Sequence, residues 1–194
     1  MIMEINYSSI IEGLINFKFV KHIDIRGSFT EIFSQRFFQS NKIDCFNINQ
    51  VNLSESRKNV FRGIHYSVAP QYQHKIITCL NGAISDFIVD LRWGSPTFGN
   101  INRIELNSKD NSMIYIPSGC GHGFLGKGEL NTVLYAQSSQ YSPKHELTLN
   151  CLDEDLNLAL PNYKSIILSD RDRQAPSLKQ LTRLELLPIY SKAE

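Results

Sequence analysis

Residues 74–91 read HKIITCLNGAISDFIVDL, two apolar runs with Asn81 and Gly82 between them. An Asn-Gly pair between apolar runs is a strong signal for a β-hairpin, because both residues accept the left-handed backbone of a tight turn. Long helical periodicity is absent before the C-terminus. Other strand-like runs cover residues 61–67, 101–106, 112–116 and 132–137. Many short strands with turns between them predict an all-β fold, an antiparallel sandwich or a jelly-roll barrel.

The N-terminal third extends this pattern. It contains three further predicted strands, residues 14–20, 28–33 and 46–53. Gly27 supplies the backbone freedom for a turn between the first two strands. In the third strand, one face starts apolar and ends with the amides of Gln50 and Asn52. Buried amides need hydrogen-bond partners, and either the backbone or a bound ligand can supply them.

The C-terminal segment has a different pattern. Ala175, Pro176 and Ser177 precede leucines at positions 178, 181 and 184, a spacing that predicts a helix. The sequence contains no internal repeat, low-complexity tract or linker between domains. We therefore expect a single domain over residues 1–194, with a C-terminal helical cap.

The composition excludes several classes of function. With 20 Lys+Arg against 19 Asp+Glu, the net charge of +1 offers no electrostatic footprint for nucleic acid or an anionic membrane. The four cysteines are far apart and include no CxxC pair, which favours reduced thiols over a disulfide framework. The sequence shows no secretory signal and no apolar run near the roughly 20 residues of a membrane span. A cytoplasmic protein is expected.

Polar residues that could take part in catalysis or binding lie inside the apolar runs. Arg62 and His65 belong to the run 61–67, and Lys75 begins the next one. His122 lies in the glycine-rich segment PSGCGHGF (117–124), and Tyr135 alternates with aliphatic residues. Burying charged groups is costly unless a partner or a ligand meets them. A small barrel would bring these five side chains together.

Three common types of site fit these residues poorly. A barrel metal site uses a close His-x-His pair, which is missing here, and the charge of Lys75 beside His74 would oppose a cation. No serine lies on the Gly-x-Ser-x-Gly turn of a hydrolase. The segment GSPTFG (94–99) lacks the lysine of a phosphate-binding P-loop, so we interpret it as a turn.

An acid/base site that removes a proton next to a carbonyl fits better. Imidazole is a common general base, and the side chain of His65 could abstract a carbon-bound proton. Lys75 could stabilise the resulting enolate oxygen, and Tyr135 could return a proton from the opposite side. The guanidinium groups of Arg26 and Arg62 suit the oxygens of a diphosphate.

At these residues the chain resembles the dTDP-4-dehydrorhamnose 3,5-epimerase family, which acts on nucleotide-linked 4-keto-6-deoxy sugars. The resemblance covers about residues 19–178 and depends on several motifs in order. Together with Tyr135, these motifs are RGSFTE (26–31), RGIHY (62–66), DFIVDLR (86–92), GSPTFG (94–99), GHGF (121–124), YSPKHE (141–146) and LSDRD (168–172).

The resemblance implies a cofactor-free and metal-free jelly roll of the cupin type, with short peripheral helices. It implies a nucleoside-diphosphate sugar as the substrate and a homodimer with exchanged N-terminal strands. His65 would be the base with Asp172 as its dyad partner, Tyr135 the acid and Lys75 the enolate-stabilising group. Substrate-binding positions would be Gln50, Asn52, Arg62, His122, Glu146 and Arg171, with Arg26 and Glu31 reaching the nucleotide of the neighbouring subunit.

The chain also departs from the common pattern of the 3,5-epimerases. The departures are Ser67, residues 76–79 (IITC), residues 136–137 (AQ) and residues 150–153 (NCLD). Thr78 and Cys79, Ser138 and residues 150–153 look closer to branches that epimerise a single centre. Epimerisation at C5, at C3 or at both is therefore expected, with dTDP or CDP as the nucleotide. Thr78 and Cys79 are the positions predicted to affect this choice. Alternatives are a 3,4-ketoisomerase, a metal-dependent cupin and a sugar-nucleotide-binding module.

Overall fold

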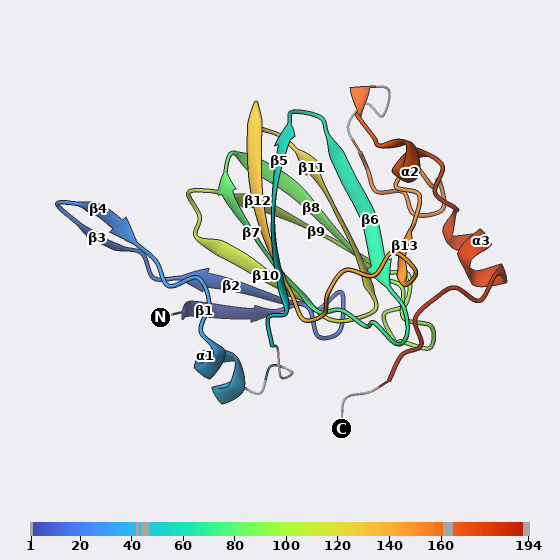
Figure 1. The fold of residues 1–194 in the computed structure, drawn as a ribbon, viewed down its shortest axis with the longest axis horizontal. Helices are drawn as coiled ribbons and strands as arrows, with labels where there is room; N and C mark the ends of the chain where they lie inside the picture. The colour runs from blue at the N-terminus through green and yellow to red at the C-terminus, as the bar shows by residue number, and fades with distance from the viewer. Residues whose placement is uncertain (1, 42, 44–46, 161–164, 192–194) are drawn as a thin grey trace.

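Two antiparallel sheets form the body of the protein in this computed structural model, which describes residues 2–41, 43, 47–160 and 165–191 (Figure 1). The six-stranded sheet has the order β1 (Ile2–Tyr7), β2 (Ile15–Phe19), β10 (Ser112–Ile116), β7 (Lys75–Asn81), β12 (Leu130–Gln137) and β5 (Gln50–Arg57). The five-stranded sheet has the order β13 (Glu146–Thr148), β6 (Phe61–Ser67), β11 (Cys120–Gly126), β8 (Ala83–Asp90) and β9 (Ile101–Asn107). The predicted class, an all-β cupin-type jelly roll with short peripheral helices, is confirmed.

The predicted hairpin at Asn81 and Gly82 is wrong. Strands β7 and β8 have the expected positions but belong to different sheets, so the turn is a corner between the two layers. Only Gly82 has a positive φ, +78°, whereas the favoured hairpin turn needs positive φ at both residues. Gly82 also lies so close to strand β12 that an added Cβ would meet the carbonyl oxygen of Leu130. The Asn-Gly pair signals a sharp turn here, not strand pairing.

The N-terminal strands also pair differently from the prediction. β2 does not pair with the strand after Gly27; it lies between β1 and β10, where Phe17 and Phe19 are buried. The hairpin instead joins β3 (His22–Asp24) to β4 (Gly27–Phe29). The predicted strand 46–53 is observed as β5, which starts at Gln50, and its expected beginning at Phe46 lies outside the described residues.

Strand β11 was not predicted because its glycines do not look like a strand. It nevertheless lies between β6 and β8. At Gly121 an added Cβ would meet Ile64 at 2.6 Å, and at Gly123 the carbonyl oxygen of Arg62 at 2.8 Å. These glycines therefore allow β11 to pack closely against its neighbour. β1 and β13, at the sheet edges, were also missed.

Buried apolar side chains form three layers. Between the sheets lie residues such as Ile77, Ile88 and Phe124. The outer face of the six-stranded sheet is covered by the helix α1 (Gln35–Ser40), whose Phe38 contacts Phe17. The outer face of the five-stranded sheet is covered by C-terminal residues, among them Leu181 of α3 and Leu187 beyond it. Apolar packing thus covers much of both outer faces, and the polar cavity lies between the sheets.

A β-bulge in β6 decides which side chains face this space. His122 of β11 pairs with His65, but Phe124, two residues further, pairs with Arg62, three residues back. The extra residue of β6 falls at Gly63, which has a φ of +107°. In a regular strand, residues three apart point to opposite faces. The bulge allows Arg62 and His65 both to face the interior, whereas Ile64 packs in the outer layer.

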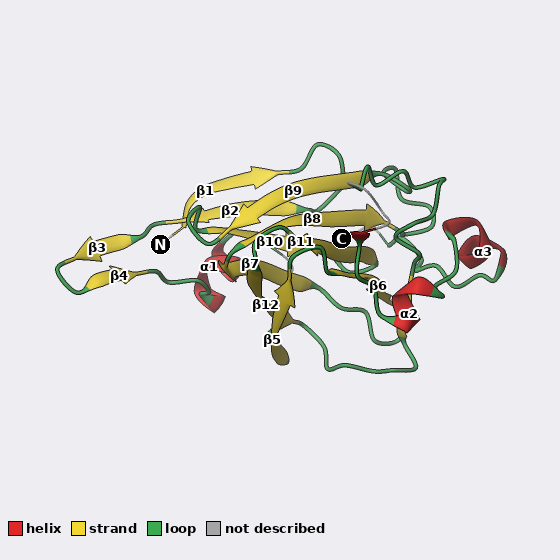
Figure 2. Cartoon of the chain, turned by 90° about the horizontal axis from the view of Figure 1, so that it is seen from above, coloured by secondary structure: helices red, strands yellow, loops and turns green. Residues whose placement is uncertain are grey.

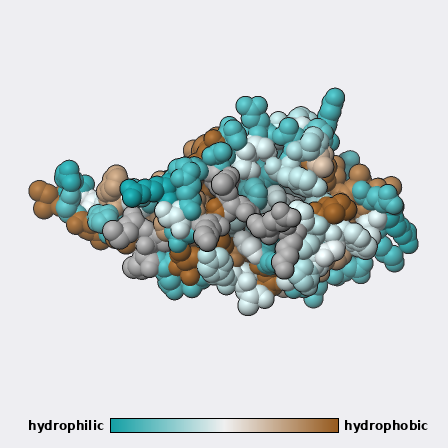
Figure 3. Space-filling view, turned by 90° about the horizontal axis from the view of Figure 1, so that it is seen from below, coloured by the Kyte–Doolittle hydropathy of each residue, from teal (hydrophilic) through white to brown (hydrophobic). Residues whose placement is uncertain are grey.

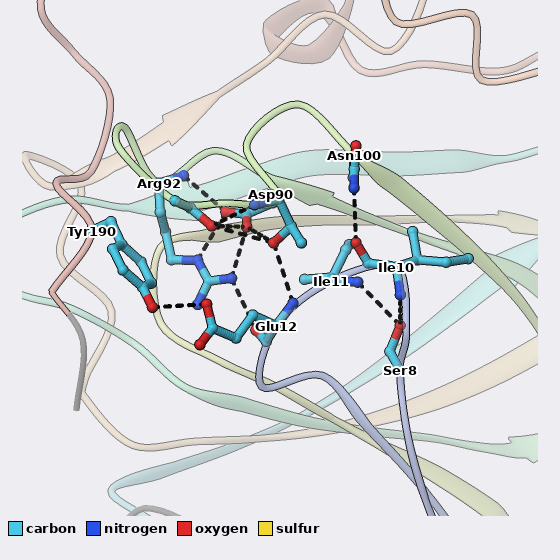
Figure 4. A network of polar contacts seen from close by, with 10 residues as sticks. Ser8, Ile10, Ile11, Glu12, Asp90, Arg92, Asn100 and Tyr190 are labelled. Atoms are coloured by element: carbon cyan, nitrogen blue, oxygen red, sulfur yellow. Dashed lines mark hydrogen bonds and ion pairs between the residues drawn. The ribbon is translucent and has the colours of Figure 1, made fainter. Parts of the chain in front are cut away.

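Buried polar contacts join the end of β8 to the distant segment at Glu12 (Figure 4). Arg92 binds both carboxylate oxygens of Asp90, at 2.8 and 2.7 Å, and donates to the carbonyl oxygen of Glu12 at 2.9 Å. Ser95 and Thr97 also donate to Asp90. Burial alone would raise the pKa of Asp90, but these hydrogen bonds lower it below its ordinary value. Asp90, Arg92, Ser95 and Thr97 belong to two of the motifs that carry the resemblance, and these contacts give them a structural role.

The C-terminal segment contains the two remaining helices, α2 (Asp170–Arg173) and α3 (Leu178–Arg183). The helix expected from the leucine spacing is α3, and this prediction is confirmed. Ser177 caps it in a capping box with Gln180. No helix among the described residues is long and apolar enough to cross a membrane.

The β3–β4 hairpin projects from the body as an arm, at the left of Figures 1 and 2. Ile23, Ile25 and Phe29 on this arm are each at least 70% exposed. Figure 3 shows hydrophobic atoms at the tip of the arm. Isolated apolar residues on a surface are ordinary, but three on one short hairpin indicate a contact surface.

Candidate active site

A cavity of about 340 Å³ opens between the two sheets. One wall comes from β5, β7 and β12, and the opposite wall from β6, β11 and β13, with α2 at the rim. Its lining is mostly polar or charged and consists of Asn52, Ser54, Arg62, His65, Lys75, His122, Tyr135, Gln137, Glu146, Ser169, Arg171 and Asp172. The size suits a small organic substrate.

His65 contacts Asp172, the residue expected to be its dyad partner. Its Nε2 lies 2.7 Å from Asp172 Oδ1, and the other carboxylate oxygen accepts a hydrogen bond from Ser169 Oγ at 2.8 Å. Ser169 also caps α2 by accepting from the backbone N–H of Asp172. Burial alone would raise the pKa of Asp172, but His65 and Ser169 lower it below its ordinary value. An ionised Asp172 favours a proton on the Nε2 that faces it.

A second dyad lies beside the first. His122 pairs with His65 across strands β11 and β6, and its Nε2 contacts Asp86 Oδ1 at 2.7 Å. Asp86 is fully buried, and its Oδ2 has no hydrogen-bond partner among the described residues. Asp86 belongs to a motif that carries the family resemblance, but the sequence did not indicate that its carboxylate would reach His122.

Lys75 crosses from one sheet to the other. Its side chain starts on β7, and its Nζ donates to the carbonyl oxygen of His65 on β6 at 3.2 Å. The residue is only 4% exposed. Burial lowers the pKa of Lys75, and the charges of Glu146 and Asp86 act in the opposite direction. A buried ammonium with one backbone partner retains donors for an oxygen in the cavity.

Tyr135 faces His65 from the other sheet. Its ring lies edge-on to His122, with the ring centroids 6.0 Å apart, and its hydroxyl lies 3.3 Å from Ser54 Oγ. Burial raises the pKa of Tyr135 above its ordinary value. The phenol therefore holds its proton at neutral pH, as a proton donor requires.

The arginines of the cavity are held by neighbouring groups. Arg62 donates from Nε to Ser56 Oγ at 2.8 Å and from Nη2 to the carbonyl oxygen of Glu55 at 3.1 Å. Arg171 donates to the carboxylate and the carbonyl oxygen of Glu146, at 3.1 and 3.0 Å. Anchored guanidinium groups are well suited to bind phosphate oxygens.

Some expected residues lie elsewhere. Gln50 is not in the cavity lining but contacts Asn52, which is. Arg26 and Glu31 lie on and after the projecting hairpin, and Arg26 is paired with Asp24. Thr78 and Cys79, expected to affect the number of centres epimerised, are also outside the lining: Thr78 bonds to the carbonyl of Ser112, and Cys79 packs between the sheets.

Three lining residues were not predicted as site residues: Ser54, Gln137 and Ser169. The alternation of β5 and β12 indicates that Ser54 and Gln137 share a face with Asn52 and Tyr135, so this signal could have found them. Within the described part of the chain, no three His, Cys, Asp or Glu side chains are grouped closely enough to hold a metal ion.

Comparisons with known proteins identify similar chains. A profile of the family described as dTDP-4-dehydrorhamnose 3,5-epimerase matches residues 8–180. The dTDP-4-dehydrorhamnose 3,5-epimerase of Mycolicibacterium smegmatis is 39% identical over 90% of this chain and 86% of its own length. A dTDP-4-dehydro-6-deoxyglucose 3-epimerase from a Streptomyces species is 41% identical over 93% of this chain and 92% of its own length.

A solved structure agrees with these matches. The crystal structure of a 3'-monoepimerase from Streptomyces bikiniensis, in complex with dTDP-quinovose, superposes with a TM-score of 0.89. The two sequences are 39% identical, and the match covers 93% of this chain and 91% of that one.

Proposed function

Since the chain belongs to the dTDP-4-dehydrorhamnose 3,5-epimerase family, we propose that it inverts C3 of a dTDP-linked 4-keto-6-deoxy sugar in deoxysugar biosynthesis. Its relatives are named as 3,5-epimerases and as 3-epimerases, and C3 is the centre that both names share. The protein is thus an isomerase that acts next to a carbonyl group.

The observation that carries the proposal is the position of three groups around one cavity. His65 and Tyr135 face the cavity from opposite sheets, and Lys75 bridges between the sheets. Inversion of a carbon centre needs a base on one side, an acid on the other, and a group that stabilises the charge formed in between. This arrangement supplies all three.

The proposed reaction has two proton transfers. His65 takes the C3 proton, and the electron pair of the C–H bond moves into an enolate whose oxygen is bound by Lys75. Asp172 stabilises the imidazolium that forms. Tyr135 then donates its proton to C3 from the opposite side, and the carbonyl is restored. His65 releases the abstracted proton to water, and Tyr135 takes a proton from water. The proton lost and the proton gained balance, so the reaction needs no redox cofactor.

We propose that the diphosphate binds at Arg62 and Arg171, both of which line the cavity. Their bonds to Ser56 and Glu146 fix their direction. His122, Asn52 and Glu146 lie nearby and are suited to hydrogen-bond the sugar. The nucleotide is proposed to be dTDP because the printed names of the relatives and of the bound ligand contain it.

We also propose a homodimer in which the β3–β4 arm crosses to a second copy. The apolar residues of the arm support this, as does the edge strand β5, whose Val51 and Leu53 are more than half exposed. In such a dimer Arg26 and Glu31 would reach the nucleotide of the partner. Sedimentation of the wild type and of Ile25→Asp tests the proposed dimer. The wild type should sediment as a dimer and the variant as a monomer. A monomeric wild type would contradict the proposal.

The proposed cellular setting follows from the cysteines. Cys79, Cys120 and Cys151 are buried and unpaired, which suits a reducing compartment such as the cytoplasm. One jelly-roll domain, with α2 and α3 as its C-terminal cap, is the proposed organisation.

Proton NMR in D2O tests the proposed function. The protein is incubated with dTDP-4-keto-6-deoxyglucose, and the C3 and C5 proton signals are followed. We expect the C3 signal to disappear as deuterium replaces the proton, and the C5 signal reports whether a second centre is inverted. A carbonyl that moves to C3 would indicate a ketoisomerase, and unchanged C3 and C5 signals would contradict the proposal.

A further inference from the structure

Three amide side chains form a hydrogen-bonded chain along the cavity wall. Gln50 Nε2 donates to Asn52 Oδ1 at 2.9 Å, and Asn52 Nδ2 donates to Gln137 Oε1 at 3.0 Å. Gln50 and Gln137 are also directly paired across strands β5 and β12. The chain of amides, which we call the amide relay (Gln50, Asn52 and Gln137), thus links the edge strand to the interior.

The direction of the relay is fixed at its outer end. The backbone N–H of Tyr141 donates to Gln50 Oε1 at 2.7 Å. A backbone N–H can only donate, so the oxygen of Gln50 must face Tyr141 and its NH2 group must face Asn52. The same reasoning then turns the oxygen of Gln137 toward Asn52. One backbone group thereby sets the orientation of three side chains.

The inner end of the relay is a donor without a partner. Gln137 lines the cavity and is only 7% exposed, and its Nε2 makes no hydrogen bond to any described residue. This atom is not among the buried polar atoms that lack a partner, so it opens to the cavity and can donate to a ligand there. Gln137 is paired with Lys75 across strands β12 and β7. Directly paired residues have their Cβ atoms about 5 Å apart, so the amide and the ammonium serve the same region of the cavity.

We propose that Gln137 Nε2 donates a hydrogen bond to the C4 oxygen of the substrate, as a second donor beside Lys75, and stabilises the enolate. This inference rests on the proposed epimerisation. An amide does not release its proton, so Gln137 acts on the charge of the oxygen and takes no part in proton transfer. Because the relay already holds the donor in place, little reorganisation is needed when the charge develops.

The first test removes the donor. Gln137→Ala should lower the kcat of C3 deuterium exchange by about 10²-fold, within the range for loss of one oxyanion donor. KM should change by less than about threefold, because a bond that strengthens with the charge acts mainly on the transition state. Circular dichroism and the melting temperature confirm that the variant is folded.

The second test reverses the relay from a distance. Gln50→Glu keeps an acceptor for Tyr141 but cannot donate to Asn52, so Asn52 should rotate and accept from Gln137 Nε2. Gln137 would then present its oxygen to the enolate. The kcat should fall at least as much as in Gln137→Ala. Gln50→Ala is the matched control, because it interrupts the relay without reversing it, and its effect on kcat should be smaller.

The double variant separates this mechanism from an effect of the new charge. If the relay transmits the change, Gln50→Glu lowers kcat no further once Gln137 is alanine. Multiplicative losses in the double variant, or an unchanged kcat in Gln137→Ala, would overturn the inference. A rise in KM alone would also overturn it and would assign Gln137 to a sugar hydroxyl. Absence of exchange in the wild type would instead refute the proposed function.

Discussion

The two histidine–carboxylate pairs of the cavity have the same contact distance, 2.7 Å, and different surroundings. The side chain of His65 is 29% exposed, whereas that of His122 is 4% exposed. The carboxylate of Asp172 is saturated by His65 and Ser169, but one oxygen of Asp86 has no partner among the described residues. The two pairs thus have the same contact distance, but His65 is far more accessible to a substrate than His122.

The difference indicates a division of roles. A base must touch the proton that it removes and must exchange protons with water after each turnover, which His65 can do. His122 is enclosed between Tyr135 and Asp86, so its pair is better suited to shape the cavity and its electrostatic field. The predictions below test this division, in order of decreasing effect.

Replacing the histidines one at a time should give unequal losses. His65→Asn removes the base and should lower the rate of C3 deuterium exchange by about 10⁴-fold, near the upper limit for general base catalysis. His122→Asn should lower this rate only about tenfold, as expected for a residue that orients the substrate through a hydrogen bond. Rates from NMR in D2O decide between them. Equal losses in the two variants would refute the division of roles.

Neutralising the second dyad should change the pH profile. The charge of Asp86 raises the pKa of both Lys75 and Tyr135. Asp86→Asn should therefore lower both values and shift the alkaline limb of the kcat/KM profile by about one pH unit toward lower pH. His122→Asn, which leaves the carboxylate in place, is the control and should shift the limb less. An unmoved limb in Asp86→Asn would show that this carboxylate does not influence the two groups.

The smallest effect should be on stability in acid. The pKa of Asp172 is lowered in the folded protein, so its carboxylate contributes stability above its unfolded pKa of about 3.9. This contribution is lost as the pH falls through the folded pKa. Urea unfolding at pH 6 and pH 3 should show a greater loss of unfolding free energy for the wild type than for Asp172→Asn. Equal losses would mean that the dyad adds nothing to stability.

Much of the architecture could be predicted because strands with a buried face leave a local pattern. The runs that became β6, β8 and β10 had nearly the observed limits. Pairing could not be predicted in the same way: Asn81 and Gly82 signal a sharp turn, but the choice between a hairpin and a corner depends on strands far away in the sequence. Glycine-rich β11 was missed because its residues were selected for close packing, not for strand propensity.

The candidate site shows the same limit. His65, Lys75 and Tyr135 stood out as polar residues within apolar strands, and the structure brings them to one cavity. Whether each acts as predicted stays a prediction until variants are measured. The resemblance indicated the contact of His65 with Asp172. The Asp86 contact and the direction of the amide relay could not be predicted, since they depend on distances between separate strands.

Gly63 lies at the bulge where β6 carries one residue more than the strand it pairs with. Replacing it by alanine would place a Cβ 2.5 Å from the carbonyl oxygen of His122, but deleting it would have a different consequence. The strand would return to regular alternation with Arg62 and His65 two residues apart, and residues two apart point to the same face. A chain with this deletion would keep every proposed catalytic residue, and Arg62 and the base His65 would still share a face. The bulge at Gly63 thus allows β6 to hold one extra residue without turning either side chain away from the cavity.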